Sequence, residues 1–554
     1  MSAIADLLAA AEPDEDRPLA DLVARLAADG HLVDAGPRRG VVVRGIAYDS
    51  RTVGRGSLFV AVPGAHVDGH DFVARAAEAG AAAAIVERHV RGVALPQIVV
   101  SSSQRALASA AAWWYRDPSR ELTVIGITGT DGKTTTSFLA VAALEAAGVR
   151  TGLVGTIETK IGSTRAANPA HATTPEAPAL QAALRAMVQA GDKAAIIETT
   201  SHGLALGRVD SIAYDVAILT NLTHEHLEFH GTFEAYRAAK LSLFERLGRR
   251  DSKAGIGVPK TAIVNVDDPS AALFMAAARS VGAGAIGYGA SDHADVHLDE
   301  IVDARPGLRV RFTSVAARGE VSIALDGRFN AWNVLAVIAL GEVLGLDPSR
   351  VASGLGSIER VPGRMERIDA GQPFDVIVDY AHSPASLEAV LEELGPGARG
   401  RDRGVIVVLG SAGERDRAKR PMMGRIAGER CRLVVVTDED PRDEDRETIL
   451  AEIAAGAEAV GRRRGVDLLL IPDRSEAIAA AFDRARPGDV VLLAGKGHER
   501  SIIGRGGVAA PWDEQAAARR ALDALGYRGA ANADPVPRRA ERAESGGPDQ
   551  DRPD

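Results

Sequence analysis

Residues 122–136 read L-T-V-I-G-I-T-G-T-D-G-K-T-T-T, and this stretch decides the fold class. A short apolar strand, Leu122–Ile125, leads into a loop rich in glycine and threonine, and a helix with Phe138 on its apolar face follows. This order of elements is typical of a phosphate-binding loop. Gly129 and Gly132 allow backbone N–H groups to approach phosphate oxygens, and the helix N-terminus adds a favourable dipole.

The residues after the second loop glycine supply side chains for nucleotide chemistry. Lys133 can reach the terminal phosphates of ATP, and the Thr134 hydroxyl can ligate Mg²⁺. Five residues separate Gly126 from Gly132, where the usual pattern has four, so an ordinary Gly/Thr loop is the alternative interpretation. The predicted ATP-binding residues of the loop are Gly129, Thr130, Asp131, Gly132, Lys133, Thr134 and Thr135.

Outward from this loop, strands alternate with helical stretches. The buried runs Ala194–Glu198 and Val216–Thr220 follow in the same unit, and this alternation predicts an α/β fold with a doubly wound parallel sheet. Residues 293–325 are expected to be richer in β-structure. A third unit begins near Arg360. The strands expected there are Asp375–Asp379, Val405–Gly410, Leu433–Asp438, Leu468–Ile471 and Val490–Gly495.

A smaller α/β unit precedes the phosphate loop. It is expected to contain a helical stretch at Phe72–Ala84 and a short strand at Ile98–Val100. We therefore predict three domains and a Pro-, Arg-, Asp- and Gly-rich tail that is disordered. Their ranges are 1–120, 121–358, 359–527 and 528–554.

Composition excludes several classes of protein. The chain has 554 residues, 46% hydrophobic and 25% charged, which at roughly 150 residues per domain allows three or four globular domains. The single cysteine, Cys431, excludes both a disulfide framework and a cysteine zinc site within the chain. A net charge of −10 without a long basic run, and only 4% aromatic residues, argue against a nucleic-acid partner.

Targeting signals are also lacking from the sequence. No apolar run reaches the roughly 18 residues that a membrane span needs. The acidic segment Met1–Arg17 has no basic region of the kind that starts a signal peptide. We therefore expect a cytoplasmic protein with no membrane association, and we expect it to act as a monomer.

The loop variant T-G-T-x-G-K-T-T resembles that of the Mur ligase family, and the resemblance extends over roughly residues 45 to 505. Within the family it is most similar to the ligases that add the third amino acid of the bacterial cell-wall stem peptide. The resemblance implies three domains, a central P-loop domain and a Rossmann-like C-terminal domain. It also implies that ATP phosphorylates the D-Glu carboxylate of UDP-MurNAc-L-Ala-D-Glu, and that a diamino acid then attacks the acyl phosphate to form an amide.

The resemblance assigns the catalytic and metal-binding groups. Glu198 lies at a strand's carboxyl end, and His226 lies in N-L-T-H-E-H-L-E-F-H-G, where Glu225 and Glu228 replace the family's usual aspartates. The last lysine of A-Y-R-A-A-K matches one that the family carries as a carbamate, although a plain surface lysine is the alternative. The implied catalytic residues are Lys133, Lys240, His226 and Glu198, and the implied Mg²⁺ ligands are Thr134, Glu198, His226 and Lys240 as its carbamate.

Further strings match the nucleotide and substrate sites of the family. G-R-F-N-A-W-N contributes Asn330 and Asn333 near adenine, P-G-R-M-E contributes Arg364 as a phosphate contact, and D-Y-A-H-S-P contributes Asp379 toward the ribose. Tyr380 and His382 would flank the nucleotide. For the UDP-muramoyl substrate, the family often has Gln where Leu206 stands. The implied contacts there are Tyr48, Ser50, Ala65, His66, Val67, Thr173, Thr174, Thr200, Ser201 and Arg208.

The third unit is expected to hold the incoming amino acid. The residues implied are Arg415, Glu439, Asp440, Pro441, Arg442, Gly495 and Glu499. Arginine suits a substrate carboxylate and Glu499 an ammonium. The diaminopimelate enzymes read D-N-P-R where this chain reads E-D-P-R at 439–442. Arg442 favours meso-diaminopimelate, which we predict, whereas the negative Asp440 leaves lysine or ornithine open.

Two other functions stay open at this point. One is another ligase of the superfamily, such as a different Mur enzyme or a folylpolyglutamate-type synthase. The other is a nucleotide-binding regulator without ligase activity, which would keep the P-loop but would not need Lys240, His226 and Glu499 together.

Overall fold

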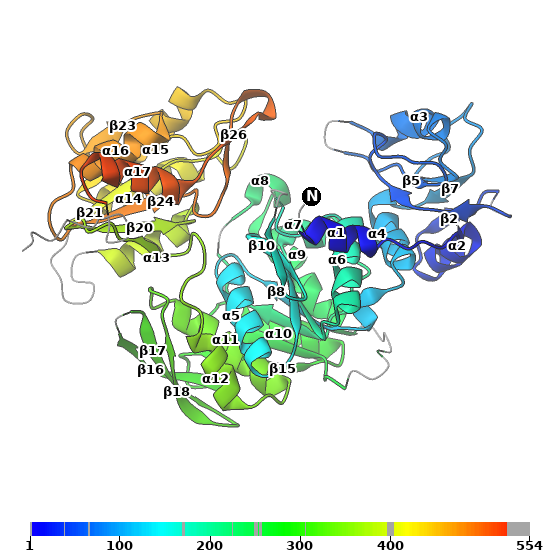
Figure 1. Ribbon diagram of the computed structural model, residues 1–554, viewed down its shortest axis with the longest axis horizontal. Coiled ribbons are helices and arrows are strands. Elements are labelled where there is room, and N and C mark those ends of the chain that lie inside the picture. The colour runs from blue at the N-terminus through cyan, green and yellow to red at the C-terminus, as the bar shows by residue number, and fades with distance from the viewer. Residues whose placement is uncertain are drawn as a thin grey trace, which may run out of the picture.

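The computed structural model describes residues 3–37, 39–64, 67–168, 172–223, 225–248, 253, 257–304, 306–395 and 404–528. Figure 1 shows three bodies, blue at the N-terminus, cyan to green in the centre and yellow to red at the C-terminus. One large sheet lies in each of the ranges 1–120, 121–358 and 359–527, which we retain as proposed domains. The predicted uridine contacts Ala65 and His66, and the predicted tail beyond Arg528, lie outside the described residues.

The central body contains an eleven-stranded sheet in the described part of the chain, parallel from β9 to β16 and extended at both ends by antiparallel strands. Its spatial order is β11 (Thr164–Ala167), β10 (Glu158–Ile161), β9 (Thr151–Val154), β12 (Ala194–Glu198), β8 (Thr123–Thr128), β13 (Val216–Leu219), β14 (Thr261–Asn265), β15 (Gly284–Gly289), β16 (Val296–Asp303), β17 (Leu308–Ser314) and β18 (Arg318–Ile323). The expectation that residues 293–325 are rich in β-structure is confirmed.

Helices cover both faces of this sheet, as a doubly wound fold requires. On one face, Ile125 and Ile127 pack in a core with α5 (Lys133–Ala146), α11 (Asn330–Val343) and α12 (Pro348–Gly356). Leu122 and Val124 face the opposite core, with α6 (Ala177–Ala190), α9 (Phe233–Glu245) and α10 (Ala271–Ser280). The short helices α7 (Ser201–Ala205) and α8 (Leu227–His230) lie at the carboxyl ends of the strands.

The first glycine of the predicted phosphate loop lies inside a strand. β8 continues to Thr128, so the predicted strand end at Ile125 was too early and the loop itself begins at Gly129. A Cβ atom on Gly126 would lie 2.7 Å from a ring carbon of Tyr214 and 3.0 Å from a methyl carbon of Leu243. Gly126 therefore serves core packing, which explains the extra residue in the glycine spacing.

The C-terminal body has a six-stranded sheet within the described residues, parallel except for one edge strand. Its order is β19 (Glu366–Ile368), β20 (Asp375–Asp379), β24 (Val490–Ala494), β21 (Val405–Leu409), β22 (Leu433–Val436) and β23 (Leu468–Leu470). All five predicted strands are confirmed. Helices α13 (Pro384–Leu394), α14 (Lys419–Arg430) and α15 (Arg446–Glu458) cover one face, and α16 (Arg474–Asp483) and α17 (Glu514–Ala524) the other. A hairpin of β25 (Ser501–Ile503) and β26 (Ala509–Pro511) projects from this body.

The N-terminal body holds a five-stranded sheet in its described part. The strand order is β2 (Leu32–Asp34), β7 (Gln97–Val100), β6 (Ala83–Val86), β5 (Leu58–Val60) and β4 (Ile46–Ala47). Helices α2 (Leu19–Ala28), α3 (Val73–Glu78) and α4 (Ser103–Trp114) accompany it, and β1 (Arg17–Pro18) pairs with β3 (Val42–Val43).

Two features of this body differ from a simple reading of its sequence. The predicted helical stretch Phe72–Ala84 is wrong at its end, because Gly80 adopts a φ of +91° and the chain then enters the buried strand β6. The first helix, α1 (Ala3–Ala10), packs against α6 of the central body, where Ile4 joins the core. In the part of the chain that the structure describes, none of the helices combines the length and the apolar character that crossing a bilayer requires.

Replacing Gly126 by alanine is expected to destabilise the protein by about 1–3 kcal/mol, because the new methyl group must displace the Tyr214 ring or the Leu243 side chain. The matched control is Gly284→Ala in the same sheet, where the nearest atom to a new Cβ is 3.6 Å away. That substitution should change stability by less than about 0.5 kcal/mol. Urea unfolding curves measure both, and equal midpoints for the two variants would contradict the packing role of Gly126.

Candidate active site

A cavity of about 720 Å³ lies between the central and C-terminal bodies. The loops that follow β8, β12, β13 and β14 line one side of it, and residues 379–390 at the end of β20 line the other. Ligands bind at the carboxyl ends of strands in open parallel sheets, and the volume suits a small molecule. The cavity is therefore where we place the predicted nucleotide site.

The phosphate loop is held by hydrogen bonds to the loop that follows β13. The Thr130 N–H donates to the carbonyl of Asn221 at 2.8 Å, and the Asp131 N–H donates to the Asn221 side chain at 2.9 Å. Gly129 adopts a φ of +149°, and a Cβ atom there would lie 1.9 Å from the Thr220 hydroxyl. Only glycine allows this approach, so the loop conformation depends on Gly129.

Two lysine side chains converge on one carbonyl of this loop. The Lys133 ammonium, at the start of α5, donates to the carbonyls of Gly129 and Thr130 at 3.0 and 2.8 Å. The Lys240 amine reaches the same Gly129 carbonyl at 2.6 Å from α9. The predicted Lys133 and Lys240 are thus brought together at the phosphate loop.

Lys240 lies in an environment that disfavours its positive charge. The side chain is only 2% exposed, and its nitrogen lies 4.6 Å from the centre of the Tyr236 ring. Burial and the nearby charge of Lys133 lower the pKa of Lys240 well below its usual value. The Tyr236 hydroxyl also shares a 2.9 Å hydrogen bond with the Thr130 hydroxyl. A surface lysine, the alternative interpretation, does not describe this residue.

His226 also lies next to Tyr236, with 6.1 Å between the two ring centres. It adopts a φ of +57°, and its ring nitrogens lie 3.4 Å from a Glu225 oxygen and 3.7 Å from a Glu228 oxygen. The edge of its ring faces His202, whose pKa is lowered to about 4 by burial and by the neighbouring histidines. The described residues contain no cluster of three His, Cys, Asp or Glu side chains able to hold a metal.

Glu198 ends β12 as predicted, and it is fully buried. Its Oε2 accepts hydrogen bonds from the hydroxyls of Thr134 at 2.8 Å and Thr156 at 2.7 Å, and its Oε1 accepts from the Thr156 N–H at 3.0 Å. Thr156 also shares a 3.0 Å hydrogen bond with Thr173. The carboxylate therefore faces the phosphate loop, and a solvated strand-end role does not apply.

Asn330 and Asn333 share one face of α11, as their spacing predicts. The Asn333 amide nitrogen donates to the Asn330 oxygen at 2.9 Å, while the Asn333 oxygen accepts from the Thr136 hydroxyl at 3.0 Å. Both line the cavity, and so do two aromatic residues of the same string, Phe329 and Trp332. The asparagine pair thus joins α11 to α5, and the aromatic rings provide an apolar wall.

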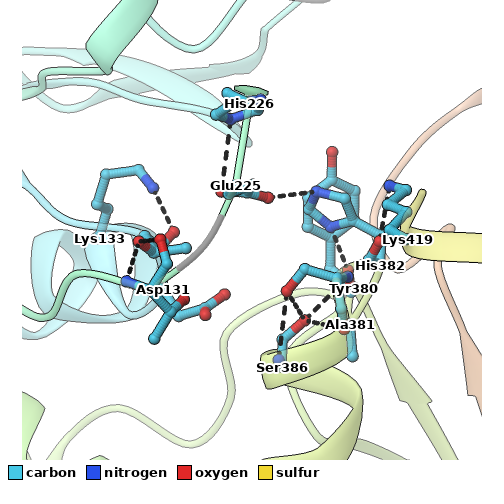
Figure 2. A network of polar contacts seen from close by, with 12 residues as sticks. Asp131, Lys133, Glu225, His226, Tyr380, Ala381, His382, Ser386 and Lys419 are labelled. Atoms are coloured by element: carbon cyan, nitrogen blue, oxygen red, sulfur yellow. Dashed lines mark hydrogen bonds and ion pairs between the residues drawn. The ribbon is translucent and has the colours of Figure 1, made fainter. Parts of the chain in front are cut away.

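A contact between the two bodies crosses the cavity, as Figure 2 shows. Glu225 from the central body lies 3.3 Å from His382 of the C-terminal body, whose other ring nitrogen lies 2.9 Å from the Tyr380 carbonyl. Burial opposes the charge on His382, but the hydrogen bond with Glu225 offsets it and raises the pKa of the imidazole. His226 and His382 together lower the pKa of Glu225 despite its burial. This ion pair links the two walls.

The C-terminal wall also contributes Asp379 and Arg364. The Asp379 carboxylate accepts the backbone N–H groups of Met365 and Ala381, both at 2.7 Å, and burial raises its pKa. The Arg364 guanidinium lies 3.4 Å from the Thr134 hydroxyl, so it reaches the phosphate loop across the domain junction. Its predicted place as a phosphate contact is consistent with this position.

The predicted muramoyl contacts continue away from the cavity toward the N-terminal body. Thr174 bonds to both the N–H and the hydroxyl of Thr200 at 3.0 Å, and its carbonyl accepts from Arg208 at 2.9 Å. Arg208 also pairs with Glu176 at 2.6 Å. Burial and the Glu176 charge raise the pKa of Tyr48, which places Tyr48 beside this pair.

The other described muramoyl residues are more scattered. Ser50 is half-buried and Val67 is exposed, at the surface of the N-terminal body. The Ser201 hydroxyl is buried and has no hydrogen-bond partner among the described residues. Figure 1 places their two bodies side by side, so a substrate touching all of them would bridge the bodies.

The segments that carry the predicted amino-acid contacts, around residues 413–415, 439–442 and 495–499, meet in the C-terminal body. The Asp440 carbonyl accepts the Gly413 N–H at 2.8 Å, and its carboxylate accepts from Lys496 at 2.8 Å. Lys496 pairs in turn with Glu499 at 2.5 Å. The Tyr380 hydroxyl donates to Glu499 at 3.2 Å, which joins this site to the nucleotide cavity.

The remaining amino-acid residues surround that cluster. Arg442 adopts a φ of +55°, and Pro441 precedes it half-buried. A Cβ atom on Gly495 would lie 3.3 Å from the Glu439 carboxylate, so only glycine leaves this space open. Arg415 is exposed, and its charge acts on His202 of the central body. All of these predicted residues except Arg415 therefore gather in one place.

Sequence reasoning missed several residues of the site. Tyr236 precedes Lys240 by four positions, so helical spacing could have placed it on the same face. Lys496 immediately follows the predicted Gly495, but its partner Asp440 lies 56 positions earlier, and no local pattern marks the pair. Thr156 comes from a loop with no motif, and nothing in the sequence marks its contact with Glu198.

Comparisons with known proteins show the family of this chain. Three family models match the chain: the Mur ligase family catalytic domain at residues 42–115, the Mur ligase middle domain at 127–341, and the Mur ligase glutamate ligase domain at 363–497. UDP-N-acetylmuramyl-tripeptide synthetase of Roseiflexus sp. (strain RS-1) is 48% identical over 92% of this chain and 100% of its own length. The chain belongs to the Mur ligase family.

Two further relatives agree with this assignment. UDP-N-acetylmuramoyl-L-alanyl-D-glutamate–2,6-diaminopimelate ligase of Geobacillus kaustophilus (strain HTA426) is 41% identical over 87% of this Mur ligase and 95% of its own length. A solved structure of a ligase with the same name is 30% identical, with a TM-score of 0.60 over 89% of this chain and 97% of that one. The predictions of a Mur ligase and of its α/β fold are confirmed.

The phosphate loop of this Mur ligase should bind a polyphosphate anion by itself. Pyrophosphate at about 100 times its dissociation constant should stabilise the protein by about 2.7 kcal/mol, seen as a rise in the thermal unfolding midpoint. Lys133→Ala should lose this rise, while Lys193→Ala, an exposed lysine just before β12, should keep it. An undiminished rise in Lys133→Ala would contradict the assignment.

Proposed function

We propose that this Mur ligase is an ATP-dependent, ADP-forming ligase that joins a diamino acid to the D-Glu of UDP-MurNAc-L-Ala-D-Glu, in peptidoglycan precursor synthesis. The observation that carries the proposal is the meeting of Lys133, Lys240 and Glu198 on one phosphate loop, next to the Asp440–Lys496–Glu499 cluster. A regulator that only binds a nucleotide has no use for that second cluster.

Each of the three proposed domains would hold one part of the substrate set. Residues 1–120 would hold the uridine end, residues 121–358 ATP, and residues 359–527 the amino acid. Among diamino acids we propose meso-diaminopimelate, because the name of the Geobacillus relative contains 2,6-diaminopimelate. We propose that the enzyme acts in the cytoplasm.

Mg²⁺ fits the donor set on the phosphate loop. The Thr134 hydroxyl and the Glu198 carboxylate are oxygen donors 2.8 Å apart, which is the ligand type Mg²⁺ prefers beside phosphates. Arg364 approaches the same hydroxyl. Bound there, Mg²⁺ would neutralise charge between the terminal phosphate and the substrate carboxylate.

A carbamate on Lys240 fits its surroundings. Only an uncharged amine can add CO₂, and burial together with Lys133 favours the uncharged form of Lys240. The carbamate would replace an amine at the phosphate loop by an anionic oxygen ligand. His226 lies next to the same Tyr236 ring, and with it the carbamate would offer a second metal position.

In the proposed reaction, residues of the chain bind and orient the reacting groups. Lys133 would hold the terminal phosphates of ATP while the D-Glu carboxylate attacks the γ-phosphorus, which gives an acyl phosphate and ADP. Glu499 and Arg442 would orient the diamino acid so that its free amine attacks the acyl carbon, and phosphate leaves as the amide forms. The Glu225–His382 pair would keep the two walls together and water out.

A coupled phosphate-release assay tests the proposed function. Phosphate release should require ATP, UDP-MurNAc-L-Ala-D-Glu and a diamino acid together, with meso-diaminopimelate compared against lysine and ornithine. Release that no diamino acid stimulates would overturn the proposal and favour another ligase of the superfamily. Release without the UDP-muramoyl substrate would also contradict it.

Lys240→Ala is expected to lose turnover by at least about a hundredfold, because no carbamate can form. A small carboxylate such as acetate or formate should restore part of the activity, since it can occupy the vacated space as an anionic ligand. Lys193→Ala serves as the exposed control and should need no rescue. An unimpaired Lys240→Ala enzyme would remove the carbamate from the mechanism.

A further inference from the structure

The loop of residues 439–442 is held in place by two hydrogen bonds to the backbone N–H and carbonyl of Ile503. The Ile503 N–H donates to the Asp440 carboxylate at 2.9 Å, and its carbonyl accepts the Arg442 N–H at 3.0 Å. Strand β25 therefore sets the relative position of the two charged residues. The Asp440 carboxylate has a second donor, Lys496, at 2.8 Å.

Lys496 is a fully buried cation among carboxylates. Burial lowers the pKa of its ammonium, but Glu499, Asp440 and Glu439 more than offset burial and raise it. Lys496 is therefore charged in the folded protein, and its charge is shared between Asp440 at 2.8 Å and Glu499 at 2.5 Å. Asp440 is itself only 6% exposed, so its charge meets little solvent.

Two other charged side chains of the cluster each have a polar atom without a hydrogen-bond partner among the described residues. The Arg442 Nε and the Glu439 Oε2 are both buried, and neither has a hydrogen-bond partner among the described residues. A buried polar atom without a partner costs free energy, so each is a place for a ligand group. One is a hydrogen-bond donor on a cation and the other an acceptor on an anion, which together suit a ligand end that carries both an ammonium and a carboxylate.

We propose that Lys496 is the positioning residue that sets the charge offered to the far end of the incoming amino acid. By pairing with Asp440, it leaves Arg442 and Glu439, each with a buried atom that has no partner among the described residues, as the charges offered to the substrate. The negative charge of Asp440 then does not attract a cationic side chain, which the sequence alone left open. The inference rests on the proposed function, and it favours a zwitterionic side-chain end such as that of diaminopimelate over a purely cationic one.

The alternative is that Lys496 only holds three loops together. Loss of a structural ion pair would lower activity with every amino acid alike, whereas loss of a charge balance changes the preference between amino acids. The quantity that separates the two is a ratio: kcat/KM for meso-diaminopimelate divided by kcat/KM for lysine.

Four variants of the full-length enzyme measure this ratio. Lys496→Met makes the cluster one unit more negative and should lower the ratio about tenfold or more, whereas the nearly isosteric Asp440→Asn makes it one unit less negative and should raise the ratio. The double variant should return the ratio to within about threefold of the wild type. Lys496→Arg keeps the charge and should keep the ratio.

Asp438→Asn is the matched control. It makes the same acid-to-amide change two residues earlier, but its carboxylate pairs with Arg446 rather than with Lys496. The ratio should not move in this variant.

An unchanged ratio in Asp440→Asn overturns the inference, and so does a double variant that fails to restore the ratio. Because Asp440→Asn keeps the number of non-hydrogen atoms, it decides the matter even if Lys496→Met does not fold. A wild-type enzyme stimulated by neither amino acid overturns the proposed function, and with it this inference. If either amino acid stimulates the wild-type enzyme but the kcat/KM ratio is the same in all variants, the inference is overturned and the proposed function stands.

Discussion

The carbonyl oxygen of Gly129 accepts hydrogen bonds from two lysines, and the rest of the site depends on that meeting. Two ammonium groups at one carbonyl repel each other, and one of them, Lys240, is buried. Its charge is therefore the one that the structure disfavours. The crowding therefore favours the uncharged, reactive amine at Lys240 and leaves Lys133 as the charged lysine at the phosphate loop.

The fold delivers these groups because parallel strands present their carboxyl ends at one edge. β8 brings the phosphate loop, β12 brings Glu198, and the segment after β13 brings Asn221 under the loop. Gly126 lets β8 and Tyr214 pack closely just before that edge. The C-terminal body then closes the cavity with groups from the end of its own strand β20, and Glu225 and His382 meet between the two bodies (Figure 2).

Local patterns made much of this predictable from the sequence. Short apolar runs between helices are a local signal, which is why Ala194–Glu198 and Asp375–Asp379 match the structure residue for residue. The stretch Phe72–Ala84 failed because alanine content outweighed the signal of Gly80. Pairings between distant segments left no local trace: Thr156 with Glu198 is a contact over 42 positions and Lys496 with Asp440 one over 56.

Charge compensation explains how a chain with a net charge of −10 can serve anionic substrates. Three carboxylates around the cavity are engaged by partners: Glu198 by threonine hydroxyls, Asp379 by backbone N–H groups, and Glu225 by His382. A carboxylate whose oxygens are so engaged repels an approaching phosphate less than a bare one does, while the lysine and arginine groups remain directed at the loop. The amino-acid site follows the same rule, since Lys496 engages Asp440. Overall charge is thus irrelevant to binding here, because each site sets its own potential through partners a few ångströms away.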